Sequence, residues 1–501
     1  MGPHRPNVAP VRAVVAALTA VVLLVLAGCG GSSISPKKAA EAQNALLGNQ
    51  GAAGNGSGLV PSDGQSGSVD NPVPGADPTA PSGSGNPTAP TSNGGGGGGG
   101  GGNSNGGGGG GGSVAPPKGV SGASCNGFAN GTGITNDTIR IGNSSDISGP
   151  VPGLFTQAQQ ATKAFVAYFN NSGAKICGRK LVLDNYDSHT DAGGDQAGYT
   201  KGCASDFAMV GSMSSFDSGG AKTAQDCGLP DVRAIATTVD RGNCTTCFGA
   251  QPAGPYAFQN AVPDFIIRKT GGKKAAMLYI NIGASAANGI SQQKHETERG
   301  MKFVYTSPID VADFNYGPYV QAMKSKGVTS VQFIASDAQF ARLVQAFKAN
   351  NFSPKLFLID PTGYDANYPS LAGADAKGTT VFLNFVPFEE SSTSPEERLY
   401  MQYLQQVSPG AKPGFFGVFA WSAARLFVEQ ATKLGGKLNR KTLIAAVKKV
   451  DNWTANGMHA PQHVGSKKIG DCWRFIQWSG SAWVPTDGTK YQCRGLSGTN
   501  P

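Results

Sequence analysis

Residues 133–142 read Gly133-Ile134-Thr135-Asn136-Asp137-Thr138-Ile139-Arg140-Ile141-Gly142, and the fold prediction rests most heavily on them. The polar run at the centre of this stretch is typical of a turn, and the alternation that follows it is typical of a short strand. Residues 157–171 then place alanines and phenylalanines at helical spacing. We therefore expect the folded part to begin near Cys125 with a strand followed by a helix.

The same alternation continues along the chain. We expect further strands at 180–184, 207–211 and 232–236, with helices at 195–204 and 219–225. This order predicts an α/β fold with a largely parallel, doubly wound sheet. The pattern restarts with strands at 275–280, 301–305, 330–335, 355–359 and 379–385 and helices at 288–298, 316–326, 338–349, 395–406, 415–434 and 440–450. A second lobe is thus implied, and residues 472–484 alternate like a hairpin.

Residues 1–28 have the layout of a signal peptide. Two arginines precede an apolar run over residues 13–26, and small residues stand directly before Cys29. The run is short for a membrane span, and its end resembles a bacterial lipoprotein box. This resemblance implies cleavage before Cys29 and a lipid on its thiol, which would anchor the protein to the outer face of the cell membrane. The alternative is an ordinary secretory signal with a chance cysteine.

Residues 29–119 are dominated by Gly, Ser, Pro, Asn and Ala, with glycine runs at 94–102 and 106–112. Such a segment cannot bury enough apolar surface to fold, so it predicts a disordered tether. A flexible coil of about 90 residues spans roughly 50 Å. That reach would let the folded part, residues 120–501, reorient above a membrane, although a plain spacer is equally compatible.

Eight cysteines remain once Cys29 is set aside, and an even number in an exported chain suggests four disulfides. These cysteines are Cys125, Cys177, Cys203, Cys227, Cys244, Cys247, Cys472 and Cys493. Counting cannot fix the connectivity. Local spacing favours Cys203 with Cys227 and Cys472 with Cys493, which leaves Cys244 with Cys247 and Cys125 with Cys177.

The charge pattern argues against a nucleic-acid partner. The chain has 41 basic and 32 acidic residues, a formal charge of +9. The basic residues are scattered and are not interleaved with aromatics, as a nucleic-acid surface would require. The positive surplus is better explained by a solvated surface.

Four segments, in their order and spacing, resemble the type I periplasmic binding proteins of the leucine/isoleucine/valine-binding kind. They are residues 133–142, Asp146-Ile147-Ser148-Gly149-Pro150, Ala167-Tyr168-Phe169-Asn170 and Gly178-Arg179-Lys180-Leu181. The resemblance spans about residues 131–484. It implies two Rossmann-like lobes joined by a three-strand hinge, with lobe 1 at about 131–258 and 386–450 and lobe 2 at about 259–385 and 451–501. A ligand would lie between the lobes, at the strand carboxyl ends.

The family holds the carboxylate and ammonium of an amino acid with a Ser-rich loop after the third strand and an Ala-Thr loop after the fourth. The matching positions here are Ser214, Ser215, Phe216, Ala236, Thr237 and Thr238. Hydroxyls and backbone amides can satisfy a buried carboxylate without a second charge. Ser148 and Phe155 belong to the loop expected to face the cleft. The alternative for Ser214 and Ser215 is capping of the following helix.

The second lobe departs from the family pattern. Asn288, between Ala287 and Gly289, stands where a Tyr-Gly pair is common. Ala338 stands where the family has an acidic residue, and Asp337 is one position before it. Asp337 either meets a ligand ammonium or caps the helix that starts there. Tyr364 is a further cleft candidate. The departure puts a branched-chain amino acid in doubt, so a related amide, a peptide fragment or another small polar metabolite stays open.

The resemblance implies the solute-binding lipoprotein of an ABC uptake transporter, a monomer that captures a small ligand and presents it to permease subunits. The alternative is a ligand-sensing or surface interaction protein on the same scaffold. An enzyme is not expected, because the sequence has no G-x-S-x-G, H-E-x-x-H or P-loop motif. We expect no cofactor and no metal site. Pro461 separates His459 from His463, and the Cys244 to Cys247 spacing fits a structural staple.

Overall fold

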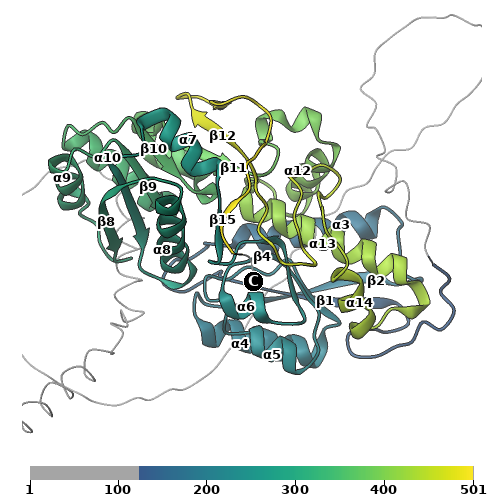
Figure 1. The fold of residues 1–501 in the computed structure, drawn as a ribbon. Coiled ribbons are helices and arrows are strands. Elements are labelled where there is room, and N and C mark those ends of the chain that lie inside the picture. Colours follow the sequence, from purple (N-terminus) through teal and green to yellow (C-terminus); the bar gives the residue numbers. More distant parts are fainter. Residues whose placement is uncertain (1–122, 500–501) are drawn as a thin grey trace, which may run out of the picture. The chain divides into compact units, whose positions relative to one another are not determined.

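A computed structural model describes residues 123–499 (Figure 1). The expected signal peptide, Cys29 and the Gly-rich tether lie outside the described residues. In the described part, strands and helices alternate and build two main sheets, so the α/β prediction is confirmed. Every helix in this part of the chain is too short or too polar to cross a bilayer.

The first sheet is parallel throughout, with the order β2-β1-β3-β4-β5. Its strands are β1 (Thr138–Ser145), β2 (Lys180–Asp187), β3 (Ala208–Val210), β4 (Asp231–Ala236) and β5 (Cys247–Pro252). The helices of this lobe are α3 (Thr156–Asn171), α4 (Ala192–Ser205), α5 (Ala221–Asp226), α6 (Val239–Asn243), α12 (Pro395–Val407), α13 (Phe415–Leu434) and α14 (Arg440–Val447).

Helices cover both faces of the first sheet, which is why its central strands are buried. Ile141 and Val210 belong to the core shared with α3 and α13, whereas Met209, on the opposite face of β3, packs with α4 and α5 (Figure 1). The long helix α13 is buried around most of its circumference. This explains its almost continuous apolar sequence.

The second sheet has the order β13-β12-β11-β10-β9-β7-β8. Its strands are β7 (Ala275–Ile280), β8 (Phe303–Ile309), β9 (Ser330–Ile334), β10 (Leu356–Ile359), β11 (Thr380–Leu383), β12 (Cys472–Trp478) and β13 (Trp483–Pro485). Pairing is parallel from β8 to β11, and β12 joins β11 antiparallel. The expected hairpin at 472–484 is therefore the antiparallel pair of β12 and β13.

Helices also flank both faces of the second sheet. They are α7 (Ala261–Thr270), α8 (Gly283–Glu298), α9 (Gly317–Ser325), α10 (Asp337–Ala349) and α11 (Asn367–Ala372). Phe265 of α7 stacks on Phe475 of β12 at a centroid distance of 4.0 Å, whereas Phe340 of α10 meets Phe333 of β9 on the other face, at 5.6 Å. Alternate residues of the strands thus face opposite helix layers.

Several short elements complete the described part. The 3-10 helices are η2 (Pro361–Gly363), η3 (Gly373–Ala376), η4 (Phe388–Thr393) and η5 (Gly435–Lys437). The remaining strands are β6 (Ala257–Gln259), β14 (Gln492–Cys493) and β15 (Leu496–Gly498), where β15 pairs with β6 and β14 with β12.

The chain passes between the two lobes three times: after β5, after β11 and after α14 (Figure 1). Each lobe is therefore assembled from segments far apart in the sequence, as the fold prediction requires. The residue limits of the lobes stay a prediction. The strand β5 was not expected from the sequence, because Gly249, Gln251 and Pro252 interrupt its apolar pattern.

Four disulfides staple the described part. They join Cys125 to Cys177, Cys203 to Cys227, Cys244 to Cys247, and Cys472 to Cys493. Two of these, Cys203 to Cys227 and Cys472 to Cys493, are the pairs that local spacing favoured, and the other two are the pairs that this choice left. The first closes a loop across 52 positions and ties the start of the folded part to the turn before β2, so it restricts the unfolded chain most.

Candidate ligand-binding site

A cavity of about 180 Å³ lies where the carboxyl ends of strands from both sheets meet. Ile235 near the end of β4 and Gln251 near the end of β5 border it from the first lobe. Ile280 at the end of β7 and Ile334 at the end of β9 border it from the second lobe. Parallel α/β sheets characteristically bind ligands at such strand ends.

The cavity wall is mostly apolar. Six aromatic side chains contribute: Phe155, Phe258, Phe382, Phe415, Phe416 and Trp473. Phe155 and Phe416 meet edge to face, with ring centroids 4.4 Å apart. These rings come from separate segments of the chain. Together they form an apolar surface that suits the hydrocarbon part of a small ligand.

Charge in the cavity wall is confined to one carboxylate. Among the described residues that line the cavity there is no Lys, Arg or His, and the one acidic residue is Asp360, directly after β10. Its Oδ2 accepts hydrogen bonds from Thr362, at 2.6 Å from the hydroxyl and 3.3 Å from the backbone N–H. Burial raises the pKa of the Asp360 carboxyl to about 6.

Two buried aspartates of the first lobe hold the loops that follow β3 and β4. Asp146 accepts a hydrogen bond from the backbone N–H of Ser215 at 2.8 Å, and burial raises the pKa of its carboxyl. Asp217 accepts from the backbone N–H of Thr237 at 3.0 Å and from the hydroxyl of Thr238 at 2.5 Å. The backbone N–H groups of Ser215 and Thr237 are therefore already used within the chain.

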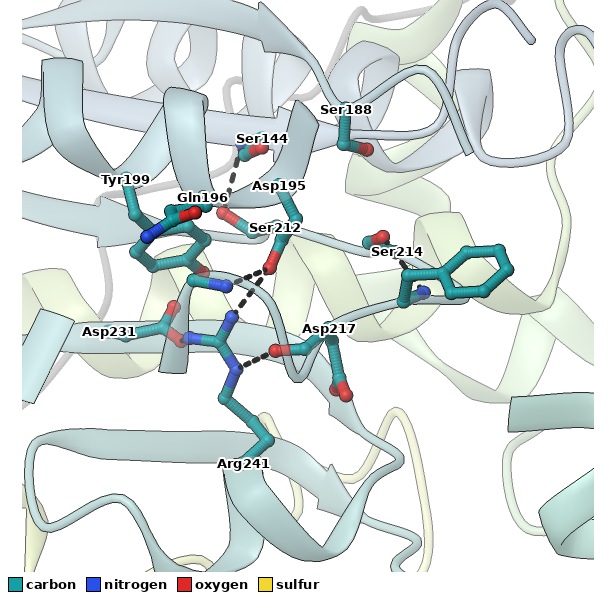
Figure 2. Close-up of polar contacts among 12 residues, drawn as sticks. Ser144, Ser188, Asp195, Gln196, Tyr199, Ser212, Ser214, Asp217, Asp231 and Arg241 are labelled. Atoms are coloured by element: carbon teal, nitrogen blue, oxygen red, sulfur yellow. Dashed lines mark hydrogen bonds and ion pairs between the residues drawn. The ribbon is translucent and has the colours of Figure 1, made fainter. Parts of the chain in front are cut away.

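A buried ion-pair network stands behind these loops, and Figure 2 shows Arg241 between Asp195, Asp217 and Asp231. The guanidinium lies 2.9 Å from a carboxylate oxygen of Asp195 and 2.9 Å from one of Asp231. Its Nε donates to the backbone carbonyl of Asp217 at 2.7 Å. All three charged partners are fully buried. The network fixes the position of Asp217, and through it the loop after β4.

A polar trio lies behind the cavity wall of the second lobe. Gln292 borders the cavity and donates to Glu296 at 3.2 Å and to Gln332 at 2.6 Å. Burial raises the pKa of the Glu296 carboxyl to about 8. These contacts hold the Gln292 side chain in one orientation.

The two lobes touch beside the cavity. The backbone N–H of Ala284, in the first turn of α8, donates to the carbonyl of Ser215 at 2.9 Å. Gln157 of α3 donates to the carboxylate of Asp365, in the loop after η2. The structure therefore has the lobes in contact around the cavity.

The sequence model of the periplasmic binding protein family matches residues 138–482. The chain belongs to this family. Its members' fold is the two-lobed α/β architecture that the resemblance predicted. No curated protein sequence matches the chain.

Solved structures agree with this fold. A fatty acid ABC transporter substrate-binding protein from Thermomonospora curvata has a TM-score of 0.61 and 17% identity, over 74% of this chain and 97% of that one. A branched-chain amino acid transporter substrate-binding protein from Streptococcus pneumoniae, in complex with isoleucine, has a TM-score of 0.59 and 14% identity, over 73% of this chain and 100% of that one. A solute-binding protein from R. palustris in complex with 4-hydroxybenzoate has a TM-score of 0.58 and 19% identity, over 73% of this chain and 98% of that one.

The cavity of this periplasmic binding protein contains part of the predicted site. Phe155, Ser215, Thr237 and Asn288 line it. The other predicted positions do not: Ser148, Ser214, Phe216, Ala236, Thr238, Asp337 and Tyr364. Their assignment to the ligand stays a prediction, but local contacts explain why several lie elsewhere.

In the first lobe, the hydroxyl groups outside the cavity serve local structure. Ser148 pairs with His189 at 2.7 Å, and the Ser214 hydroxyl accepts from the backbone N–H of Phe216. Thr238 caps α6 by accepting from the backbone N–H of Arg241. The suggestion that Ser214 and Ser215 cap the next helix is wrong, because Gly220 occupies the N-cap of α5.

In the second lobe, Tyr364 stacks on Phe388 and its hydroxyl lies 2.5 Å from Glu389, which directs it into the protein core. The suggestion that Asp337 caps α10 is wrong, because Ser336 does so in a capping box with Gln339. The pKa of Asp337 is raised well above its usual range, mainly by burial and to a smaller extent by repulsion from Asp365 and Asp360.

Several cavity residues of this binding protein were not predicted from the sequence. Gln251 was missed together with β5, and Asp360, directly after the expected strand at 355–359, was given no role. Trp473 was assigned to the hairpin without a role. The signal that could have found Asp360 is its place directly after a parallel strand, where cleft residues concentrate.

Proposed function

We propose that this chain is the extracytoplasmic solute-binding lipoprotein of an ABC uptake transporter. Its lobes close on a small ligand, an amino acid of the branched-chain type or a related amide, and present it to permease subunits. The observation that carries this proposal is the cavity bordered by strand ends of both lobes, with an apolar wall and few polar groups. Membership in the periplasmic binding protein family supports it.

The remaining parts of the proposal rest on the sequence. Lipid attachment at Cys29 would keep the protein at the membrane surface, near its permease, and we propose that it acts there as a monomer without catalytic activity. Labelling with a radioactive fatty acid tests the anchor. The label should be incorporated by the natural chain and lost in Cys29→Ala.

A thermal-shift screen of the purified protein against amino acids, small amides, short peptides and sugars tests the binding function. A solute at a concentration of about 100 times its Kd should stabilise the fold by roughly 2.7 kcal/mol. Ser285→Trp places a large ring at the cavity wall and should abolish the shift. Ile290→Trp is the matched control, because Ile290 lies on the same helix with 57% of its side chain exposed. A silent panel, or a shift that survives Ser285→Trp, would contradict the proposal.

A further inference from the structure

Neutral carboxamide side chains supply much of the polar character of the cavity wall. They are Gln251, Gln259, Asn288, Gln292 and Gln339. The side-chain amides of Gln259 and Asn288 have no hydrogen-bond partner among residues 123–499, although Gln259 is only 4% exposed. In Gln339, Oε1 accepts from the backbone N–H and the hydroxyl of Ser336, at 2.9 and 2.8 Å, whereas Nε2 has no partner in that part of the chain.

These free amide groups lie against open space. The Gln259 and Asn288 amides and the Gln339 Nε2 are not fully enclosed by protein, in contrast to the Gln251 Oε1 atom. Asn288 is half-buried on α8, and β6, which carries Gln259, packs against that helix. A largely buried amide without a partner is costly. The wall therefore presents donors and acceptors that a ligand can satisfy.

The wall offers no free charge to a charged ligand. Its described residues include no Lys, Arg or His. The one carboxylate, that of Asp360, is held by Thr362 and by the backbone N–H of Ala335. The backbone N–H groups of Ser215 and Thr237 are also bound within the chain. A ligand carboxylate or ammonium would therefore lose its hydration without gaining a free partner of opposite charge.

A ligand carboxamide matches the free groups of the wall in kind. It both donates and accepts, as the side chains of Gln259 and Asn288 do, whereas a carboxylate only accepts and an ammonium only donates. The aromatic rings of the wall suit a hydrocarbon body. The cavity volume of about 180 Å³ is slightly above the roughly 150 Å³ that accommodates benzene, so the body is small.

We infer that the cavity binds a small neutral molecule with an apolar body and a carboxamide group, in preference to amines, carboxylic acids and amino acids of similar shape. Gln259 and Asn288 are the contacts that select it. This inference rests on the proposed solute-binding function and decides between the two ligand classes named there. Gln259 lies on β6, where the chain first passes between the lobes, so its contact adds the hinge region to the site.

The test is isothermal titration of the purified protein with four probes that share a branched aliphatic body: 4-methylpentanamide, 4-methylpentanoate, 4-methylpentylamine and leucine. We expect the amide to bind about tenfold or more tightly than each charged probe. Asn288→Asp keeps the shape and adds a negative charge, so it should weaken the amide about tenfold and make the amine the preferred probe. Gln293→Glu, on the same helix but outside the cavity wall, should leave the order of the probes unchanged.

A second variant separates binding from folding. Gln259→Met keeps the approximate volume and removes an amide that makes no hydrogen bond within the described part of the chain. The Tm of the free protein should therefore not fall, while the 4-methylpentanamide Kd should rise severalfold. A Tm loss with an unchanged Kd would show that Gln259 supports the fold instead, and would overturn its role.

A charged probe that binds as tightly as the amide, an unchanged probe order in Asn288→Asp, or failure of all four probes to bind would overturn the inference. If the thermal-shift screen then yields a charged solute that Ser285→Trp excludes, the solute-binding function stands and only the ligand class falls. If that screen is silent, the function itself fails.

Discussion

The contact between the lobes is sensitive to a single added methyl group at Gly283. It begins α8 with a φ of +41°, and a Cβ there would lie 2.5 Å from the carbonyl oxygen of Ser215 in the facing lobe. The next residue, Ala284, donates its N–H to that same oxygen. Gly283→Ala should therefore force the lobes apart and break this hydrogen bond.

The expected magnitude has two parts. The left-handed backbone is unfavourable for alanine by about 1 kcal/mol whether the lobes are open or closed, so it lowers the free energy of unfolding by that amount. The clash arises only when the lobes touch, and loss of the hydrogen bond alone removes about 1 to 1.5 kcal/mol from the closed state. Because about 1.4 kcal/mol is a factor of ten, the Kd for a bound solute should rise about tenfold.

The assay is calorimetric titration with a solute found in the thermal-shift screen, combined with thermal unfolding of the free protein. Gly300→Ala is the matched control: its φ is +99°, and nothing lies within 4 Å of an added Cβ. It should lose similar stability with an unchanged Kd. If Gly283→Ala bound the solute as tightly as the natural chain, the argument that this lobe contact belongs to the ligand-bound state would be refuted.

Three further predictions concern stability. Burial lowers the pKa of His459 to about 4, against about 6.5 in the unfolded chain, so the neutral ring stabilises the fold fully above pH 6.5, and about 3 kcal/mol of stability is lost as the pH falls toward 4. In urea titrations, His459→Gln should lose less stability on acidification than the natural chain does. An identical pH profile for the two proteins would count against this. Replacing both Cys125 and Cys177 by serine should lower the free energy of unfolding by about 4 kcal/mol, because their disulfide closes a long loop, and a loss below about 1 kcal/mol would contradict the assignment. Arg241→Met should lower the free energy of unfolding by about 3 kcal/mol, because Asp195 loses its ion-pair partner whereas Asp231 keeps Arg233 at 3.6 Å. Arg140→Met, at an exposed pair, should lower it by less than about 1 kcal/mol; equal losses in denaturant melts would refute the difference.

The fold was largely predictable because its elements carry strong local patterns. The strand at 275–280 and the helix at 415–434 were predicted with the limits that the structure has, since one is a buried apolar run and the other an apolar helix without breakers. The strand β5 was not, because burial between β4 and neighbouring helices outweighs its Gly, Gln and Pro residues. Tertiary packing overrides local preference there.

The site was predictable only in part, because it depends on which atoms are already satisfied. The sequence indicated Ser215 and Thr237, and both border the cavity. It could not indicate that Asp146 and Asp217 occupy their backbone N–H groups, since these contacts join residues about 70 and 20 positions apart. The hydrogen bonding of these two loops therefore depends on long-range contacts that the motif resembling the family does not specify.

A crystal structure of the protein with the best-binding solute of the screen would show directly whether the cavity binds solute. We predict solute density in the cavity, in contact with Gln251 of one lobe and Asp360 of the other, with the Ala284 to Ser215 hydrogen bond retained. Solute density elsewhere on the protein, with this cavity empty, would contradict the claim that these strand ends form a solute-binding site.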